Sequence, residues 1–196
     1  MIIASATESL VPGITHVAQA TAEDKISAKQ QEQFGFLRPY TAEEYLRFAT
    51  LADHFYCVLE ENQVVAFLLA HSCDKIELKE EVYAYIKSTQ AKPFIVARQL
   101  AVLPHLARKG YGRILYNHLA KQVATGPITY DVAIGFIWKE PNHNHASEIF
   151  NRKMNAREIS TYALKDGRGL VGIWKIPLAS NAAFEPNVAT EASSPA

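Results

Sequence analysis

The sequence predicts a mixed α/β fold, in which one sheet contains both parallel and antiparallel strands. Two apolar runs at residues 94–104 and 128–138 are separated by a helical pattern at residues 110–124. Strands joined by a crossover helix run parallel, and strands that are apolar throughout are typical of a sheet covered on both faces. Shorter β-branched and aromatic runs joined by tight turns predict antiparallel hairpins on either side of this unit.

The N-terminal part predicts one strand followed by two helices. Residues 14–19 have the composition of a short strand. Thr21 then offers an N-cap for a helix that continues toward Phe34, and Gly35 can end it. Residues 41–44 form a capping-box pattern, which predicts a second, shorter helix.

A hairpin and an ambiguous segment follow these helices. Residues 54–60 and 63–71 are β-branched and aromatic runs separated by two turn residues, so they predict a hairpin. The charged, mixed pattern between residues 72 and 92 fits a polar helix, but its portion at residues 82–86 also fits a strand. Both alternatives remain open from the sequence.

The chain after the central unit predicts one helix and a closing hairpin. Residues 145–155 place apolar side chains on one face at helical spacing. Residues 157–164 and 170–178 read as two strands, and the glycine-rich residues 166–169 between them favour a tight turn.

Composition bounds the class of protein. The 196 residues are 48% hydrophobic, which suits one globular domain, predicted at residues 1–178. Twenty Lys and Arg against 20 Asp and Glu give no basic excess, so we do not expect a nucleic-acid partner. The last stretch, residues 179–196, is rich in Ala, Ser and Pro and is expected to be a mobile tail.

Location and redox chemistry follow from what the sequence contains. The N-terminus lacks a basic leader, and no apolar run approaches the ~18 residues that span a bilayer, so no membrane partner is expected. Cys57 and Cys73 do not form a CxxC pair, which argues against a disulfide scaffold or a thiolate metal site. A cytoplasmic protein is the simplest interpretation.

The turn at residues 107–113, which we call the phosphate cradle, is the most informative segment. Gly110 and Gly112 can adopt backbone conformations closed to other residues and let main-chain N–H groups approach a ligand. The predicted helix begins there, and the first turn of a helix leaves N–H donors free at its positive end. Formal positive charge comes from Arg108, Lys109 and Arg113. The pattern differs from the Walker motif and, because Leu115 stands where a third glycine is needed, from the dinucleotide fingerprint.

Residues 100–119 resemble motif A of the GNAT superfamily of acyl-CoA-dependent N-acetyltransferases. The likeness comprises a strand that ends in Ala-Val-x-Pro, a short loop, Gly110 and Gly112 at the start of a helix, and apolar residues at helical spacing. Where the family has Arg or Gln, this chain has Ala107, which removes one side-chain contact.

Residues 142–156 resemble motif B of the same family. Asn144 and Lys153 match the family pattern, while Asn155 and Ala156 replace a Gly-Phe pair. Many members carry a tyrosine that can protonate the departing CoA thiolate. Here that position is Phe150, which has no proton to give.

The resemblance implies a GNAT-like fold with splayed central strands and a site for acetyl-CoA as acyl donor. CoA pyrophosphate would bind the cradle, the pantetheine arm would lie along residues 100–102, and the Val102 N–H would face the developing oxyanion. The residues implied in cofactor binding are Leu100, Ala101, Val102, Ala107, Arg108, Lys109, Gly110, Tyr111, Gly112, Arg113, Asn144 and Phe150.

A base that deprotonates the amine is harder to find in the sequence. Glu140 and His143 follow the second central strand and are the catalytic candidates, with His145 beside them. Gln99 stands where some members carry Glu, and an amide cannot act as a base. The His143-x-His145 pair also raises the idea of a metal site, but no third ligand is evident in the sequence, so no metal is predicted.

The resemblance implies transfer of an acetyl group from acetyl-CoA directly to a primary amine of a small molecule or peptide. Two alternatives remain open: an acyl-CoA-binding regulatory module without catalysis, and an acetyltransferase that acts on protein lysines or N-termini. The sequence does not identify the acceptor or the oligomeric state, and a homodimer is one option.

Overall fold

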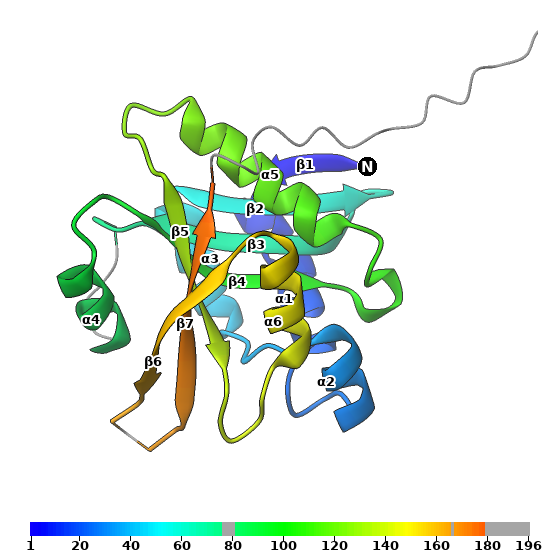
Figure 1. Ribbon diagram of the computed structural model, residues 1–196. Coiled ribbons are helices and arrows are strands. Elements are labelled where there is room, and N and C mark those ends of the chain that lie inside the picture. The colour runs from blue at the N-terminus through cyan, green and yellow to red at the C-terminus, as the bar shows by residue number, and fades with distance from the viewer. Residues whose placement is uncertain (76–80, 166, 179–196) are drawn as a thin grey trace, which may run out of the picture.

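The computed structural model describes residues 1–75, 81–165 and 167–178 of the chain. The tail predicted at residues 179–196 lies outside the described residues, as does Asp166 of the predicted turn. In the described part, seven strands form one sheet in the order β1-β2-β3-β4-β5-β7-β6 (Figure 1). The strands are β1 Ile2–Ser5, β2 His54–Glu60, β3 Gln63–Ser72, β4 Ile95–Val102, β5 Val132–Trp138, β6 Arg157–Ala163 and β7 Leu170–Pro177.

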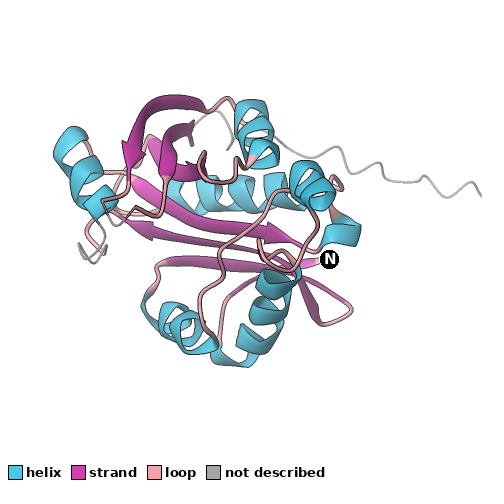
Figure 2. Cartoon of the chain, turned by 90° about the horizontal axis from the view of Figure 1, so that it is seen from below, coloured by secondary structure: helices cyan, strands magenta, loops and turns pink. Residues whose placement is uncertain are grey.

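Helices cover both faces of this sheet. Figure 2 shows α1 and α3 on one side of the strands and α5 on the other. The α-helices in the described residues are α1 Val11–Ala20, α2 Ala28–Phe34, α3 Ala42–Leu51, α4 Glu81–Thr89, α5 Tyr111–Ala124 and α6 His145–Lys153. Short 3-10 turns occupy Glu8–Leu10 and Pro104–Leu106.

The predicted mixed sheet is confirmed. β4 and β5, joined through α5, run parallel, and each of the other neighbouring pairs is antiparallel. The β2–β3 and β6–β7 hairpins form as the turn residues predicted. The capping box before α3 is also present, because the Glu44 N–H donates to Thr41 Oγ1 at 3.2 Å and the Thr41 N–H donates to Glu44 Oε2 at 2.8 Å.

The predicted strand at residues 14–19 is wrong, because this segment belongs to α1. Ile14, Val17 and Ala18 have no exposed surface, and their spacing of three and four residues places them on one helical face. The next helix begins at Ala28 and not after Thr21: Ser27 caps α2, while Thr21 donates back to the carbonyls of α1.

The ambiguous segment resolves in favour of the helix. α4 buries Val82, Tyr83 and Ile86, and these pack with Phe94 of the loop before β4 and with the inner residues of β5 and β7. The first strand of the chain, β1, which has four residues, was not predicted. It pairs with β2 at the edge of the sheet, and its outer residues are exposed, so it has no apolar alternation for a sequence pattern to detect.

Candidate active site

The two central strands separate in the middle of the sheet. β4 and β5 pair only at Ile95 with Ala133, Val96 with Ile134, and Ala97 with Gly135. Both strands continue past these positions, β4 to Val102 and β5 to Trp138. The edge of β4 that faces β5 is therefore open beyond Ala97, as the predicted splay requires.

This open edge presents main-chain hydrogen-bonding groups. The Leu103 N–H donates to the Val65 carbonyl of β3 at 2.9 Å. Because successive N–H groups of a strand point to opposite edges, the Val102 N–H points away from β3 and toward the gap. Leu100 shares this orientation and, like Val102, is half-buried, whereas Ala101 between them is buried.

The phosphate cradle lies at the end of this edge. Gly110 adopts a left-handed conformation with φ 92°, and Arg108 has φ 67°. The Ile114 N–H donates to the Gly110 carbonyl at 3.0 Å and closes the first turn of α5. The amides of residues 111–113 precede that bond, so they have no acceptor within the helix and face outward at its positive end. A Cβ atom added to Gly110 would meet nothing within 4 Å, which leaves the approach to these amides clear.

A cavity of about 890 Å³ joins the open edge to the cradle and continues past β5. It is lined by every residue of the predicted cofactor set except Lys109. At its other end lie side chains that come from the segment after α2, from α4, β4 and β5. We call these the acceptor end, and they are Arg38, Tyr40, Tyr83, Arg98 and Trp138.

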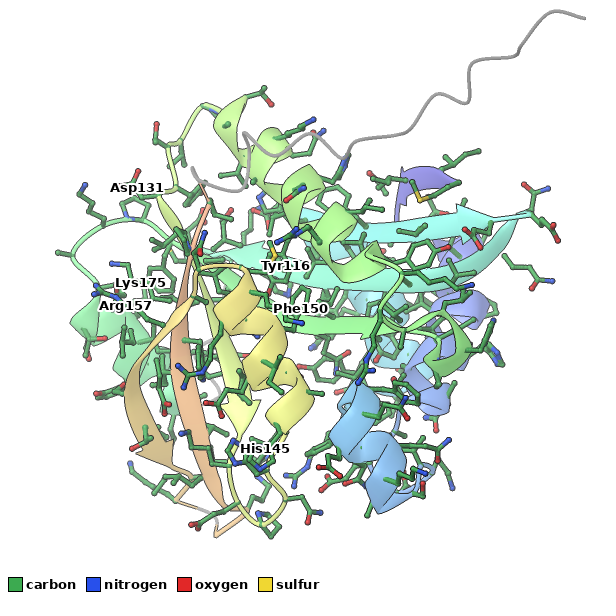
Figure 3. The ribbon with its side chains drawn as sticks, turned by 45° about the vertical axis from the view of Figure 1, so that its right-hand side comes forward. Tyr116, Asp131, His145, Phe150, Arg157 and Lys175 are labelled. Atoms are coloured by element: carbon green, nitrogen blue, oxygen red, sulfur yellow. The ribbon has the colours of Figure 1, made fainter. Side chains whose placement is uncertain are left out.

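An aromatic pair fills the wall between α5 and α6. Phe150 of α6 and Tyr116 of α5 have ring centroids 5.8 Å apart, and Figure 3 shows the two labels side by side between these helices. Gly112 permits this packing, since a Cβ there would lie 3.1 Å from the Phe150 ring. Tyr116 lines the cavity, and its hydroxyl has no hydrogen-bond partner among the described residues. Burial raises the pKa of this hydroxyl, so it stays protonated at neutral pH.

Asn144 is buried, and its side-chain amide is already engaged. Its Oδ1 accepts from the Ser147 N–H at 3.2 Å and caps α6, and its Nδ2 donates to the Phe36 carbonyl at 2.9 Å. The residue thereby ties the segment after α2 to the start of α6. Both polar atoms thus serve the fold, while Asn144 also lines the cavity and keeps the second N–H of its Nδ2.

The two predicted catalytic candidates do not line the cavity. Glu140 is exposed, and His143 donates or accepts a hydrogen bond with Glu148 at 2.8 Å outside the cavity wall. Figure 3 shows His145 at the end of α6 opposite to the region of Phe150 and Tyr116. The structure therefore does not bring either predicted candidate to the cavity wall.

One part of the metal argument from the sequence also needs correction. A third potential ligand does stand beside the histidine pair, because Glu148 follows one turn later in α6. The ligand atoms of His143, His145 and Glu148 lie within 4.8 Å of one another. Glu148 is, however, also bound by Arg152 at 2.6 Å, and the two histidine rings lie with their centroids 3.7 Å apart and their planes tilted by 36°. Both carboxylate oxygens of Glu148 thus have a side-chain partner, His143 at Oε2 and Arg152 at Oε1.

Gln99 is held in a buried hydrogen-bond chain. It accepts from the Tyr45 hydroxyl at 2.7 Å and donates to the Arg38 carbonyl at 2.9 Å. This chain links α3, β4 and the acceptor end. The observation agrees with the expectation that residue 99 does not act as a base.

Of the acceptor end, the sequence suggested only Tyr83, as one of several aromatic residues that could line an acceptor pocket. The members of the acceptor end are separated by up to a hundred residues, and only the fold brings them together. The Arg38 guanidinium carbon lies 3.5 Å from the centroid of the Trp138 ring, and Arg98 lies 5.0 Å from the centroid of Tyr83. An Arg and a Trp a hundred positions apart give no local pattern.

A sheet that opens next to a helix N-terminus, with a cavity running through the gap, is the arrangement that the resemblance to acyl-CoA-dependent transferases implies. The sequence matches the model of the acetyltransferase (GNAT) family over residues 23–155. The chain therefore belongs to this family, and acetyl transfer is the activity that the family shares. The predicted resemblance is confirmed.

Solved structures show the same fold at low sequence identity. The ribosomal-protein-S18-alanine N-acetyltransferase of Escherichia coli matches with a TM-score of 0.59 and 16% identity, over 95% of this chain and 97% of its own. Naa20 of Chaetomium thermophilum, in complex with a bisubstrate analogue, matches with 0.63 and 13%, over 94% and 90%. PaiA N-acetyltransferase of Thermoplasma acidophilum, in complex with coenzyme A, matches with 0.60 and 13%, over 90% and 98%. A comparison with curated proteins gives no significant match. None of the helices in the described residues has the length and apolar character needed to cross a bilayer.

Proposed function

We propose that the protein transfers an acetyl group from acetyl-CoA to a primary amine of a small molecule or peptide, by direct attack of the amine on the thioester. One observation carries this proposal: the unpaired edge of β4 leads straight into the phosphate cradle. The N–H and carbonyl groups of Leu100 and Val102 can pair with the amides of the pantetheine arm as an added strand would. The amides of residues 111–113 can then receive the pyrophosphate.

Cofactor contacts follow from this path. Tyr111, Gly112 and Arg113 contribute main-chain donors, Gly110 leaves the approach to them open, and the Arg108 and Arg113 side chains contribute charge. Ala107 lines the turn without a polar side chain. The Val102 N–H is the donor best placed to stabilise the oxyanion that develops on the thioester carbonyl.

Tyr116 is the proton donor in this proposal. The amine nitrogen forms a bond to the thioester carbon, the carbon–sulfur bond breaks, and the sulfur leaves with its electron pair. The Tyr116 hydroxyl gives a proton to that thiolate and becomes a phenolate. The proton released from the amine nitrogen then reaches this phenolate through water and restores the hydroxyl. Its place beside Phe150, its protonated state and its lack of another partner among the described residues support this role.

Binding and turnover test the proposal separately. Isothermal titration with acetyl-CoA should show binding, and thiol release with a panel of amines should show turnover. Binding with no turnover on any amine would favour the alternative of a non-catalytic acyl-CoA-binding module. No binding at millimolar acetyl-CoA would overturn both.

The donor role has its own test. Tyr116→Phe should lower kcat at least about 10-fold, the low end of general acid catalysis, while the affinity for acetyl-CoA changes less than about 2-fold. Phe150→Tyr in that background should restore most of the loss, because it returns a hydroxyl to the same wall. A variant that loses turnover without rescue would contradict the assignment, since a packing role at residue 116 does not predict recovery from residue 150.

A protein acceptor remains the second candidate. One of the similar structures is a ribosomal-protein-S18-alanine N-acetyltransferase and another is Naa20 in complex with a bisubstrate analogue, and these likenesses support a protein acceptor. A library of short peptides with free N-termini, compared with peptides whose only amine is a lysine, would separate the two protein acceptors.

A further inference from the structure

Charge is distributed unevenly along the cavity wall. Glu32 is the one acidic residue among the described residues that line it. The cationic residues of the wall are Arg38, Arg98, Arg108, Arg113, Lys153 and Arg168. Three of these lie on α5 and α6 or in the cradle, where CoA phosphates account for them. The other three come from the segment after α2, from β4 and from the β6–β7 turn, where the proposed cofactor supplies no phosphate.

Arg38 is the most firmly oriented of these cations. Its guanidinium lies over the Trp138 ring at 3.5 Å, and its Nε donates to Glu23 Oε2 at 2.7 Å. Asn142 donates to the other oxygen of Glu23 at 2.6 Å. Burial raises the pKa of Glu23, but the hydrogen bonds from Arg38 and Asn142 outweigh this effect and lower it, so the carboxylate stays ionised.

The backbone around Arg38 is held as well. The Leu37 N–H donates to the Thr21 carbonyl at 2.8 Å, and the Glu23 N–H donates to the Leu37 carbonyl at 2.9 Å. Gln99 fixes the Arg38 carbonyl from β4 at 2.9 Å. A guanidinium held by stacking, an ion pair and its own backbone loses little conformational entropy when it binds a ligand.

Only part of the guanidinium is used by these contacts. Within the described residues, no partner binds either Nη group, and the side chain is 34% exposed. Two adjacent N–H donors in one plane match the two oxygens of a carboxylate. Trp138 fixes that plane, and Glu23 fixes its rotation, so the fork is set before a ligand arrives.

The same cations affect the amine. Positive charges near an amine lower its pKa and thereby favour the neutral, nucleophilic form. Arg38 and Arg98 both line the acceptor end, and the predicted bases Glu140 and His143 do not line the cavity. Because the ionised Glu23 offsets the charge of Arg38, Arg98 contributes most to this effect on the amine.

We propose that the acceptor is an amine that also carries a carboxylate, and that Arg38 binds this carboxylate. The inference rests on the proposed function and specifies its substrate class. Free α-amino acids and peptides with an acidic side chain near the N-terminus both supply the required chemistry.

A binding experiment tests the site without turnover. N-acetyl alanine, leucine and phenylalanine, and their carboxamides, are titrated calorimetrically into protein saturated with CoA. We expect at least one carboxylate to bind about 10-fold or more tightly than its amide, as a charge-assisted hydrogen-bond pair predicts. Arg38→Gln should abolish this difference, while Arg157→Gln, which removes an exposed arginine outside the cavity, should retain it. Equal affinity of acids and amides, or no effect of Arg38→Gln, would overturn the inference.

A kinetic experiment identifies the source of the carboxylate. Thiol release is measured with free amino acids against their amides, and with C-terminally amidated peptides that begin with Asp against Asn. Rates are referred to the free-amine fraction, because amidation lowers the pKa of an α-amine. Arg38→Gln should lower kcat/KM about 10- to 100-fold for the preferred carboxylate and less than about 3-fold for its amide.

The two proposals fail in different ways. Carboxylate binding that depends on Arg38, without thiol release from any amine, would remove the proposed function and leave this site. Thiol release at equal efficiency from carboxylates and amides would leave the function and remove the site.

Discussion

Replacing Asn144 with alanine should destabilise the fold and leave cofactor affinity nearly unchanged. The substitution removes the cap of α6, which is typically worth about 1 kcal/mol. It also leaves the buried Phe36 carbonyl without its donor, at a cost of about 1–3 kcal/mol. Together these losses predict a fall of about 2–4 kcal/mol in the free energy of unfolding.

Serine at the same position separates the two contributions. A serine hydroxyl can still cap α6 but does not replace the amide that reaches Phe36, so Asn144→Ser should lose about 1–3 kcal/mol. Asn142→Ala is the matched control, because that side chain is exposed and makes one hydrogen bond to Glu23, and it should lose less than about 1 kcal/mol. Urea unfolding followed by circular dichroism gives these values, with an unchanged m-value as the check on two-state behaviour.

Acetyl-CoA titration of the same variants decides the role of residue 144. We expect dissociation constants within about 2-fold of the original for Asn144→Ser, since both Oδ1 and Nδ2 of Asn144 are held by hydrogen bonds within the protein. An Asn144→Ala protein of unchanged stability that binds acetyl-CoA 10-fold more weakly would refute the reasoning, because the side chain would then be a cofactor ligand.

Three further predictions concern the cradle, pH and metals. Gly110→Ala and Gly167→Ala each place a side chain at positive φ with open space around it, so both should lower the free energy of unfolding by about 1 kcal/mol, but only Gly110→Ala should weaken acetyl-CoA binding in titrations. Burial, with Arg98 adding to it, lowers the pKa of His71 to about 4. As the pH falls, His71 is therefore protonated at a higher pH in the unfolded chain than in the folded chain, and the free energy of unfolding should fall by about 3 kcal/mol between pH 6.5 and pH 4. In His71→Gln, unfolding curves measured over this range should show most of that pH dependence lost. Prolonged dialysis against a chelator should leave thiol release unchanged, and lost activity restored by a divalent ion would instead assign a metal to the His143, His145 and Glu148 cluster.

The central part of the fold was predictable because its signals are local and agree with one another. Residues 94–138 combine two apolar strands, a left-handed glycine and a helical spacing, and each of these is a property of adjacent residues. Residues 14–19 failed for the opposite reason. Ile14, Thr15 and Val17 favour a strand by composition, but Pro12 at the helix start and the burial of one helical face determine α1.

The candidate site likewise contains parts that the sequence predicts and parts that it does not. The cradle and the open strand edge are contiguous in sequence, so a motif finds them. Arg38 and Trp138 meet only after the sheet has formed, and the engagement of Asn144 with Phe36 depends on where α2 ends. Glu140 and His143 show that position in the sequence does not suffice to predict site residues. Both directly follow a central strand, but neither side chain lines the cavity.

The separation of β4 from β5 has a consequence for the protein before any reaction occurs. An unpaired strand edge is a template for another strand, and most folds cover or shorten such edges. Here the unprotected edge lies inside the molecule, next to the cradle, where the cofactor proposed above would cover it. A ligand present at 100 times its dissociation constant stabilises a protein by about 2.7 kcal/mol. The lifetime of this chain in a cell would then depend on the supply of acyl-CoA, so starvation for the acyl donor would reduce the amount of enzyme as well as its rate.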